Sequence, residues 1–333
     1  MSNVELKLTD RSDFLWGVNT HHDWYSIYSD KNVEEQMHLM AEMGVKLLRT
    51  GIGEWAWTDK VVRLANEYGI KLMICDGVVR LENAEYNAEE QYKRAEFIAN
   101  RYNGKNGYGK IDFIQIDNEI DCYLMTRSEK ASLKPADGIR TDEYVKADIE
   151  EVCRRFANYA AGIRATDSDI KIIINSSWLH YGFYDWLKEY NVDFDIIGID
   201  WYTDMSVTLK ARGKREFEHA EFLYERYGKE IIICETNQWH DGDFDETTER
   251  SWDDEIDLLV DAYRYPYVLG ACVYELCDET YFQPENGPYN REAHFGLIKA
   301  DRDGNMLEPK PIYYRLQRLY GGKKTNKINY KDL

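Results

Sequence analysis

The sequence predicts an α/β protein, a single (β/α)₈ TIM barrel that occupies residues 1–333 as one domain. Three observations predict this fold. Eight short apolar runs alternate with amphipathic segments, which is the pattern of repeated βα units around a parallel sheet. No linker interrupts them, because proline is scarce (6 in all) and no Ser/Gly-rich spacer occurs. A length of 333 residues suits one barrel, a fold that often exceeds the usual domain size.

Each predicted strand is one of the apolar runs. In order they are Phe14–Asn19, Val45–Thr50, Ile70–Asp76, Ile111–Asp117, Ile170–Asn175, Phe194–Asp200, Glu230–Cys234 and Val268–Leu276. The clearest predicted helices are Val33–Glu42, Asp59–Tyr68, Ala88–Tyr102, Glu143–Arg164, Arg215–Tyr227, Asp253–Tyr263 and Pro311–Leu319. Their apolar residues recur every three or four positions, so one face of each should pack on the sheet. Long loops at Asp121–Thr141 and Cys277–Phe295 should shape a binding cleft.

Charge and composition limit the partners of the protein. Acidic residues outnumber basic ones by 61 to 42, a formal net charge of -19, so nucleic acid and anionic membrane surfaces would be repelled. A neutral ligand fits better, and 9 Trp and 26 Tyr suit stacking on sugar faces, although packing explains most aromatics. No 18-residue apolar stretch and no signal-like N-terminus occur, so we expect a cytoplasmic protein. A secreted protein without its signal peptide would read the same, and the oligomeric state stays open.

The cysteines and histidines predict no disulfide, metal or cofactor. Three of the six cysteines, Cys75, Cys234 and Cys272, lie within predicted strands, and no CxxC spacing occurs. They read as small buried apolar side chains. His21 and His22 are adjacent, and neighbouring side chains on an extended segment point apart, which makes them poor joint metal ligands.

Two apolar runs end in a glutamate. Asn118 and Glu119 follow the fourth predicted strand, and Glu235 follows the seventh. Alternation along an extended strand puts Glu119 on the same side as Gln115 and Asp117. The same alternation puts Glu235 with Ile233, so each run can turn its final glutamate into the barrel mouth. A pair of carboxylates facing one pocket suits glycoside chemistry; singly, each is also compatible with a solvated loop residue.

The order of these features resembles glycoside hydrolase clan A, the retaining (β/α)₈ glycosidases in which an Asn-Glu pair ends strand four and a Glu ends strand seven. The likeness runs from GVN at residues 17–19 to FGLIKADRDGNMLEPKPIYYRL near the C-terminus, which is similar to the tail of families 5 and 39. It implies that Glu119 is the acid/base and Glu235 the nucleophile, that Asn118 holds the sugar 2-hydroxyl, and that Arg49 and Tyr202 hydrogen-bond to Glu235.

The resemblance further implies cleavage of β-type O-glycosidic bonds in an oligosaccharide or polysaccharide by double displacement, without metal or cofactor. This mechanism predicts carboxyl groups about 5–5.5 Å apart. The alternative is a barrel that binds carbohydrate but has lost catalysis. A barrel for phosphorylated metabolites or metals is disfavoured, since neither a Gly-rich phosphate site nor a ligand set is found.

Further residues are predicted to line the sugar site. His22 follows the first strand, and the aromatic candidates are Trp55, Trp178, Trp239 and Tyr274. His21, Trp24 and Trp57 are neighbours with the same possible role. Many clan members carry a Trp at the end of strand eight, where this chain has Tyr274. Glu275, Asp278 and Glu279 follow it, and this acidic rim reads first as solvated loop charge and second as a set of sugar ligands.

Overall fold

A computed structural model describes residues 11–77, 87–125, 137–166, 168–211, 214, 218–238, 252–285, 287 and 289–321. Eight strands follow one another in the order β1 to β8 and form a closed barrel, which confirms the predicted fold class. The strands are β1 (Leu15–Asn19), β2 (Leu47–Gly51), β3 (Lys71–Asp76), β4 (Phe113–Ile116), β5 (Lys171–Ser177), β6 (Ile196–Asp200), β7 (Ile231–Thr236) and β8 (Val268–Val273).

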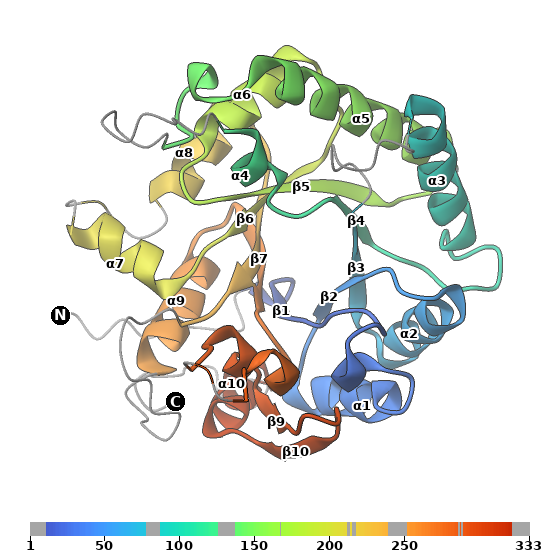
Figure 1. Cartoon of the computed structure of the whole chain (residues 1–333), viewed down its shortest axis with the longest axis vertical. Helices are drawn as coiled ribbons and strands as arrows, with labels where there is room; N and C mark the ends of the chain where they lie inside the picture. The colour runs from blue at the N-terminus through green and yellow to red at the C-terminus, as the bar shows by residue number, and fades with distance from the viewer. Residues whose placement is uncertain are drawn as a thin grey trace. The chain divides into compact units, whose positions relative to one another are not determined.

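Helices alternate with these strands (Figure 1). They are α1 (Val33–Met43), α2 (Trp55–Tyr68), α3 (Ala88–Arg101), α4 (Ile120–Leu124), α5 (Lys146–Arg164), α6 (Tyr181–Glu189), α7 (Thr203–Ala211), α8 (Glu218–Tyr227), α9 (Asp253–Arg264) and α10 (Pro311–Gly321). Among the described residues, none of these helices combines the length and the apolar character that crossing a bilayer requires.

Contacts divide the chain into two compact units. Unit 1 comprises Met1–Lys71, Trp201–Glu218 and Ile232–Leu333, and unit 2 comprises Leu72–Asp200 and His219–Ile231. Both units contribute strands to the closed barrel. The expectation of one domain over residues 1–333 therefore stays a prediction, and the two units are described separately below.

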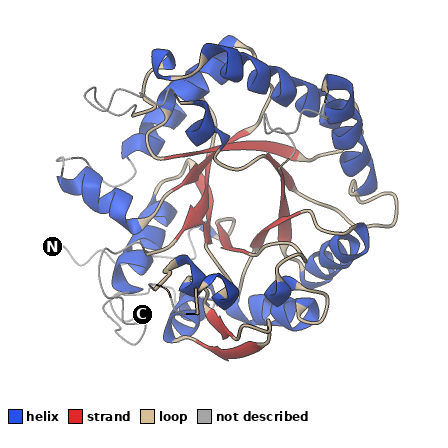
Figure 2. Ribbon diagram, viewed as in Figure 1, coloured by secondary structure: helices blue, strands red, loops and turns tan. Residues whose placement is uncertain are grey.

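In unit 1, β1 is the central strand and pairs in parallel with β2 and β8. Gly17 of β1 is opposite Leu47 and Cys272, and an added Cβ at Gly17 would collide with the Cys272 sulfur, so only glycine fits there. Helix α1 ends at Met43 and is followed by Gly44, whose φ of 89° lets its N–H bond to carbonyls of the last turn. After β8 the chain forms an antiparallel hairpin of β9 (Ile298–Ala300) and β10 (Met306–Pro309), shown as short red strands in Figure 2.

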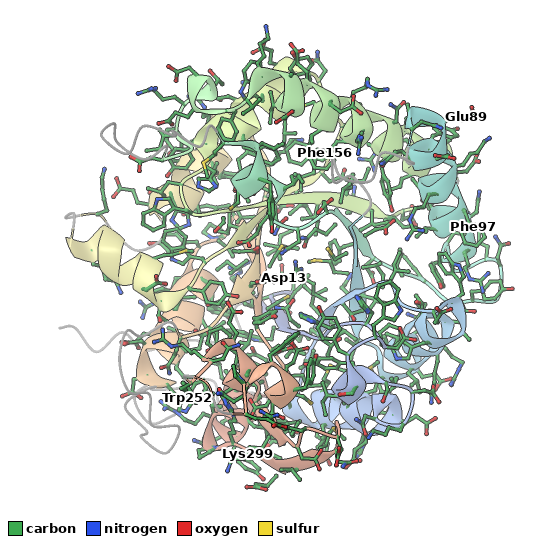
Figure 3. All side chains as sticks on the ribbon, in the orientation of Figure 1. Asp13, Glu89, Phe97, Phe156, Trp252 and Lys299 are labelled. Carbon is green, nitrogen blue, oxygen red and sulfur yellow. The ribbon has the colours of Figure 1, made fainter. Side chains whose placement is uncertain are left out.

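In unit 2, β3, β4, β5 and β6 pair in parallel in sequence order. Helix α3 begins with a capping box in which the Asn87 side chain accepts from the N–H of Glu90 and the Glu90 carboxylate accepts from the N–H of Asn87. Its outer side carries Glu89 and Phe97, whereas Phe156 of α5 is fully buried (Figure 3). The predicted apolar face of α5 is confirmed as a buried face: Phe156, Tyr159, Ala160 and Ile163 are all at most 1% exposed.

Several predicted boundaries are wrong. Helix α2 begins at Trp55 and not at Asp59, so Trp55 and Trp57 lie on a helix and not in a loop. Strand β4 ends at Ile116, because Asp117 adopts a left-handed conformation (φ 61°). Strand β8 ends at Val273, three residues before the predicted end. Helices α4, α6 and α7 were not predicted. All six cysteines lie in the described part of the chain and are not joined in disulfides there, and the three predicted in strands lie in β3, β7 and β8.

Candidate active site

In unit 1, the Glu235 carboxylate is held by two side chains from neighbouring strand ends. Glu235 is the fifth residue of β7, whose six residues are all buried, and it is itself 8% exposed. Arg49 of β2 donates from Nη1 to Oε1 of Glu235 at 2.8 Å, and Tyr202 donates its hydroxyl to Oε2 at 2.9 Å. Both predicted hydrogen bonds are present. A cation and a hydroxyl donor each favour the ionised form of a carboxyl group.

Asn19, at the end of β1, orients the arginine. Its Oδ1 accepts from Nη1 of Arg49 at 2.9 Å, and its Nδ2 donates to the Cys234 carbonyl at 3.0 Å. The amide therefore links β1, β2 and β7 and directs the guanidinium at Glu235. The sequence predicts Asn19 as the last residue of the first strand and assigns it no role in the site. The available signal was a polar residue at the end of an apolar strand, 1% exposed in the fold.

Tyr274, which follows β8, lies close to the Glu235 carboxylate. The Tyr274 hydroxyl is 3.0 Å from Nε2 of His21, and the Tyr274 carbonyl accepts from the side-chain amide of Asn237. Burial raises the pKa of Tyr274 well above its ordinary value, and Glu275 and Glu235 add to the effect. Tyr274 thus stays a neutral hydrogen-bonding group next to the charged glutamate.

Behind β7, Thr236 contacts a buried acid of α9. Its hydroxyl donates to Oε2 of Glu255 at 3.4 Å, and Glu255 is completely buried. Burial raises the pKa of Glu255 from 4.5 to about 8, so this side chain is protonated and neutral at pH 7. Strand β7, which carries Glu235, therefore packs against the neutral side chain of Glu255 on α9.

In unit 2, Glu119 is placed by a turn and not by strand alternation. Asp117 and Glu119 both adopt left-handed conformations (φ 61° and 47°), and Glu119 is the residue that precedes helix α4. The predicted alternation from Gln115 to Glu119 is therefore wrong, because it requires extended backbone throughout. The Glu119 N–H donates to Oδ1 of Asn175 on β5 at 3.1 Å, which fixes the turn.

The Asn118 side chain is oriented by two amides. Its Oδ1 accepts from Nδ2 of Asn175 at 2.9 Å and from Nε2 of Gln115 at 3.2 Å. Because the oxygen is used twice, the NH₂ group of Asn118 is the donor side of this amide. Nδ2 of Asn175 also donates to Oδ2 of Asp200 at 2.7 Å. Asn175 and Asp200, which sequence reasoning missed, therefore order both residues of the Asn-Glu pair.

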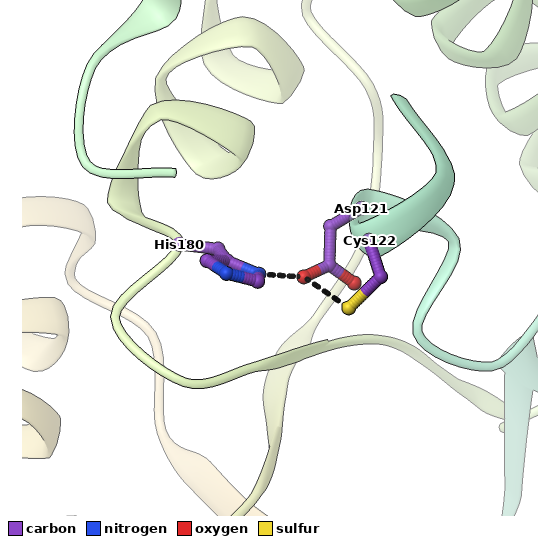
Figure 4. Close-up of side chains that lie close together, drawn as sticks. All are labelled: Asp121, Cys122 and His180. Atoms are coloured by element: carbon purple, nitrogen blue, oxygen red, sulfur yellow. Dashed lines mark hydrogen bonds and ion pairs between the residues drawn. The ribbon is translucent and has the colours of Figure 1, made fainter. Parts of the chain in front are cut away.

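An ion pair follows directly after Glu119. The Asp121 carboxylate contacts Nδ1 of His180 and accepts from the Ser177 N–H at 3.2 Å (Figure 4). This contact links α4 to the segment after β5. Cys122 also lies against Asp121, at 3.9 Å, and burial followed by the Asp121 charge raises the pKa of its thiol well above the usual range. One donor atom each of Asp121, Cys122 and His180 lies close enough to the others for the three to be considered as metal ligands.

The other predicted sugar-binding residues have varied environments. Trp57 is buried and donates its indole N–H to the Tyr28 carbonyl at 2.9 Å, which is a packing role. Trp55 and Trp178 are half-buried, and Trp178 follows β5 in a left-handed conformation (φ 50°). His22 packs against Trp24, and burial followed by the neighbouring His21 lowers its pKa. Trp239 lies outside the described residues, so sugar binding by these side chains stays a prediction.

Comparison with known proteins gives a family match over part of the chain. The family model described as glycosyl hydrolase family 53 matches residues 105–265. A curated relative from Niallia circulans, described as an uncharacterized protein in the bgaB 5′ region, is 31% identical over 134 residues. That alignment covers 38% of this chain and 32% of the relative.

Solved structures match nearly the whole chain. A family 1 β-glucosidase from Thermotoga maritima has a TM-score of 0.64 at 13% identity and covers 95% of this chain and 99% of its own. A family 53 catalytic domain from Ignisphaera aggregans has a TM-score of 0.56 at 18% identity, with 92% and 96% covered. At these identities the structures show the fold.

The barrel fold and the family match over residues 105–265 both agree with the predicted clan of glycoside hydrolases. The narrower likeness to families 5 and 39 is not confirmed.

Glu255 generates a prediction about pH. Its carboxyl group has a pKa of about 8 in the fold and an ordinary value of 4.5. Between these values the folded state binds more protons than the unfolded state, so stability falls as pH rises. Glu255→Gln should flatten the dependence of the unfolding free energy on pH from 5 to 8, by about 1.4 kcal/mol for each pKa unit lost.

Denaturant unfolding of both proteins at several pH values measures this effect. Glu225→Gln, at an exposed position of α8, is the matched control and should keep the wild-type slope. Equal slopes for wild type and Glu255→Gln would show that Glu255 is ionised in the fold.

Proposed function

We propose that the protein hydrolyses β-glycosidic bonds of an oligosaccharide or polysaccharide with retention of configuration, Glu235 being the nucleophile and Glu119 the acid/base. One observation carries the proposal: the Glu235 carboxylate receives hydrogen bonds from Arg49 and Tyr202 on its two oxygens. A carboxylate held in this way is paired with a cation and fixed in direction. Those are the properties that attack on an anomeric carbon requires.

In the first step, an oxygen of Glu235 forms a bond to the anomeric carbon while the glycosidic carbon–oxygen bond breaks. Glu119 transfers its proton to the departing oxygen. In the second step, water attacks the same carbon, its proton passes to Glu119, and the ester bond to Glu235 breaks. Two inversions give net retention, and the protonation states of both glutamates are restored.

The surroundings of the two glutamates differ in the way that these roles require. Arg49 and Tyr202 favour negative charge on Glu235. In the chain Glu119 is flanked by Asp117 and Asp121, whose side chains are 0% exposed. Nearby negative charge favours the protonated form of a carboxyl group, which an acid catalyst needs. We further propose that the NH₂ group of Asn118 donates to the sugar 2-hydroxyl.

The family 53 match favours a place near that family within the clan. Incubating the purified protein with a panel of aryl β-glycosides and defined β-linked oligosaccharides tests the proposed function. Following the reaction by NMR should show that the β-anomer forms first. First formation of the α-anomer would refute retention, and binding without turnover of any member of the panel would support the inactive carbohydrate-binding barrel instead.

Glu235→Ala tests the nucleophile. Turnover should fall on the order of 10⁴–10⁶-fold, as when a covalent nucleophile is removed from other hydrolases. Azide, which is small enough to occupy the vacated space, should restore activity and yield a glycosyl azide of inverted configuration. Glu230→Ala removes an exposed glutamate just before β7 and should leave kcat unchanged. An azide product of retained configuration would contradict the assignment.

Glu119→Ala tests the acid/base. An aryl glycoside with a good leaving group needs little protonation, so its first step should be nearly unaffected, whereas a natural β-linked oligosaccharide should react about 10²–10⁴-fold more slowly. Azide should here give a product of retained configuration, because Glu235 still forms the ester. Glu189→Ala, exposed at the end of α6, serves as the control. Equal losses on both substrates would rule out Glu119 as the acid.

A further inference from the structure

Three side chains of unit 1 converge after the ends of β1 and β8, and they are named here the His21 cluster: His21, Glu275 and Glu279. Nδ1 of His21 is 3.2 Å from Oε1 of Glu279, and one donor atom from each of the three residues lies within 4.8 Å of the others. Glu275 is 0% and Glu279 2% exposed. Asp278 is 2% exposed as well, so the prediction of a solvated acidic rim is wrong at all three positions.

Three of the converging atoms, one from each residue, lack a well-directed hydrogen bond, and the Tyr281 hydroxyl lies close to the Glu279 carboxylate. Among the described residues, Oε1 of Glu275, Oε1 of Glu279 and Nδ1 of His21 are all buried without a hydrogen-bond partner. The buried cation Lys310 is already paired with Asp278, the residue before Glu279, at 2.7 Å between Nζ and Oδ1. Two buried carboxylates thus face one histidine, and uncompensated buried charge is costly.

Two other polar atoms of the cluster, Oε2 of Glu275 and Nε2 of His21, have tyrosine hydroxyls as hydrogen-bond partners. The Tyr28 hydroxyl donates to Oε2 of Glu275 at 2.7 Å, and the Cys277 N–H donates to the Tyr28 hydroxyl at 3.1 Å. Nε2 of His21 is 3.0 Å from the Tyr274 hydroxyl. Outer hydrogen bonds of this kind orient the ligands of metal sites, in which the second ring nitrogen of a histidine and the second oxygen of a carboxylate are bonded elsewhere.

We propose that the His21 cluster binds one divalent transition-metal cation, zinc being the best fit, through Nδ1 of His21 and one carboxylate oxygen each of Glu275 and Glu279. One imidazole nitrogen and two carboxylate oxygens form a donor set that zinc accepts at about 2.0–2.2 Å, and tetrahedral geometry then puts donors about 3.4 Å apart. The 3.2 Å between His21 and Glu279 already matches. Three protein donors leave a position for water.

The proposed ion has a structural role. It joins the segment after β1 to the segment after β8 and neutralises both carboxylates, so Tyr274 and His21 are held in place beside the Glu235 strand. The sequence does not indicate this site, because His21 is more than 250 residues away from Glu275 and Glu279 in the chain. Asp121, Cys122 and His180 form the competing cluster, in which His180 and the Ser177 N–H both contact Oδ2 of Asp121 and the third donor is a thiol.

Metal binding by the full-length, untagged protein tests the inference independently of glycosidase activity. After dialysis against EDTA, calorimetric titration with zinc, manganese and calcium salts should show one zinc bound per chain, with manganese weaker and calcium weakest. The melting temperature should rise with zinc. His21→Gln and Glu279→Gln should each weaken zinc at least tenfold, whereas Glu285→Gln, at a highly exposed carboxylate, should bind like wild type.

Circular dichroism establishes that each variant is folded, and His21→Gln, at a partly exposed position, decides the outcome if Glu279→Gln does not fold. The inference is overturned if no equivalent of zinc binds, if both variants bind zinc as wild type does, or if calcium binds more tightly than zinc. Loss of zinc in His180→Gln with retention in His21→Gln would overturn it in favour of the competing cluster. None of these results depends on whether the protein cleaves a glycoside.

Discussion

Burial of a charged carboxylate at the end of β7 constrains the surrounding structure of unit 1. Glu235 is 8% exposed, and removing an ion from water costs several kcal/mol unless a partner compensates. The compensation comes from Arg49, which is buried as well and so needs its own anchor. Asn19 supplies that anchor and returns to the Cys234 carbonyl beside the glutamate. Side chains from the ends of three strands therefore stabilise one carboxylate. Replacing Asn19, Arg49 or Glu235 alone would leave a buried polar group unpaired.

The sequence predicts the strands and the polar residues that end them. The eight apolar runs located all eight strands, and the resemblance to clan A identified Arg49 and Tyr202 as the partners of Glu235. Asn19, Asn175 and Asp200 were not assigned roles, since each acts through a residue distant in the chain. A polar residue that ends an apolar strand looks the same in the sequence whether it faces solvent or a buried network, and only the closed barrel distinguishes the two.

Glu119 shows a different limit of sequence reasoning. Alternation assumes extended backbone, which holds for Glu235 within β7 but ends at Ile116 in β4. Left-handed conformations at Asp117 and Glu119 redirect the chain into α4, and no simple pattern predicts such a conformation at a non-glycine residue. Residues in this region persist only where surrounding contacts fix them, and Asn175 supplies such a contact. Backbone strain concentrated at the Asn-Glu pair is consistent with a site whose side chains are aimed for chemistry.

The buried carboxylates of this acidic chain are stabilised in different ways: some are paired with a cation, and one keeps its proton. Glu235 is paired with Arg49, Asp278 is paired with Lys310, and Glu255 keeps its proton because burial disfavours its charged form. Glu275 and Glu279 have neither a full cationic partner nor separation from each other. A buried pair of this kind is stable only with a shared proton or a bound cation. The convergence of unbonded oxygen and nitrogen atoms, with the opposite sides of His21 and Glu275 already hydrogen-bonded, favours the cation.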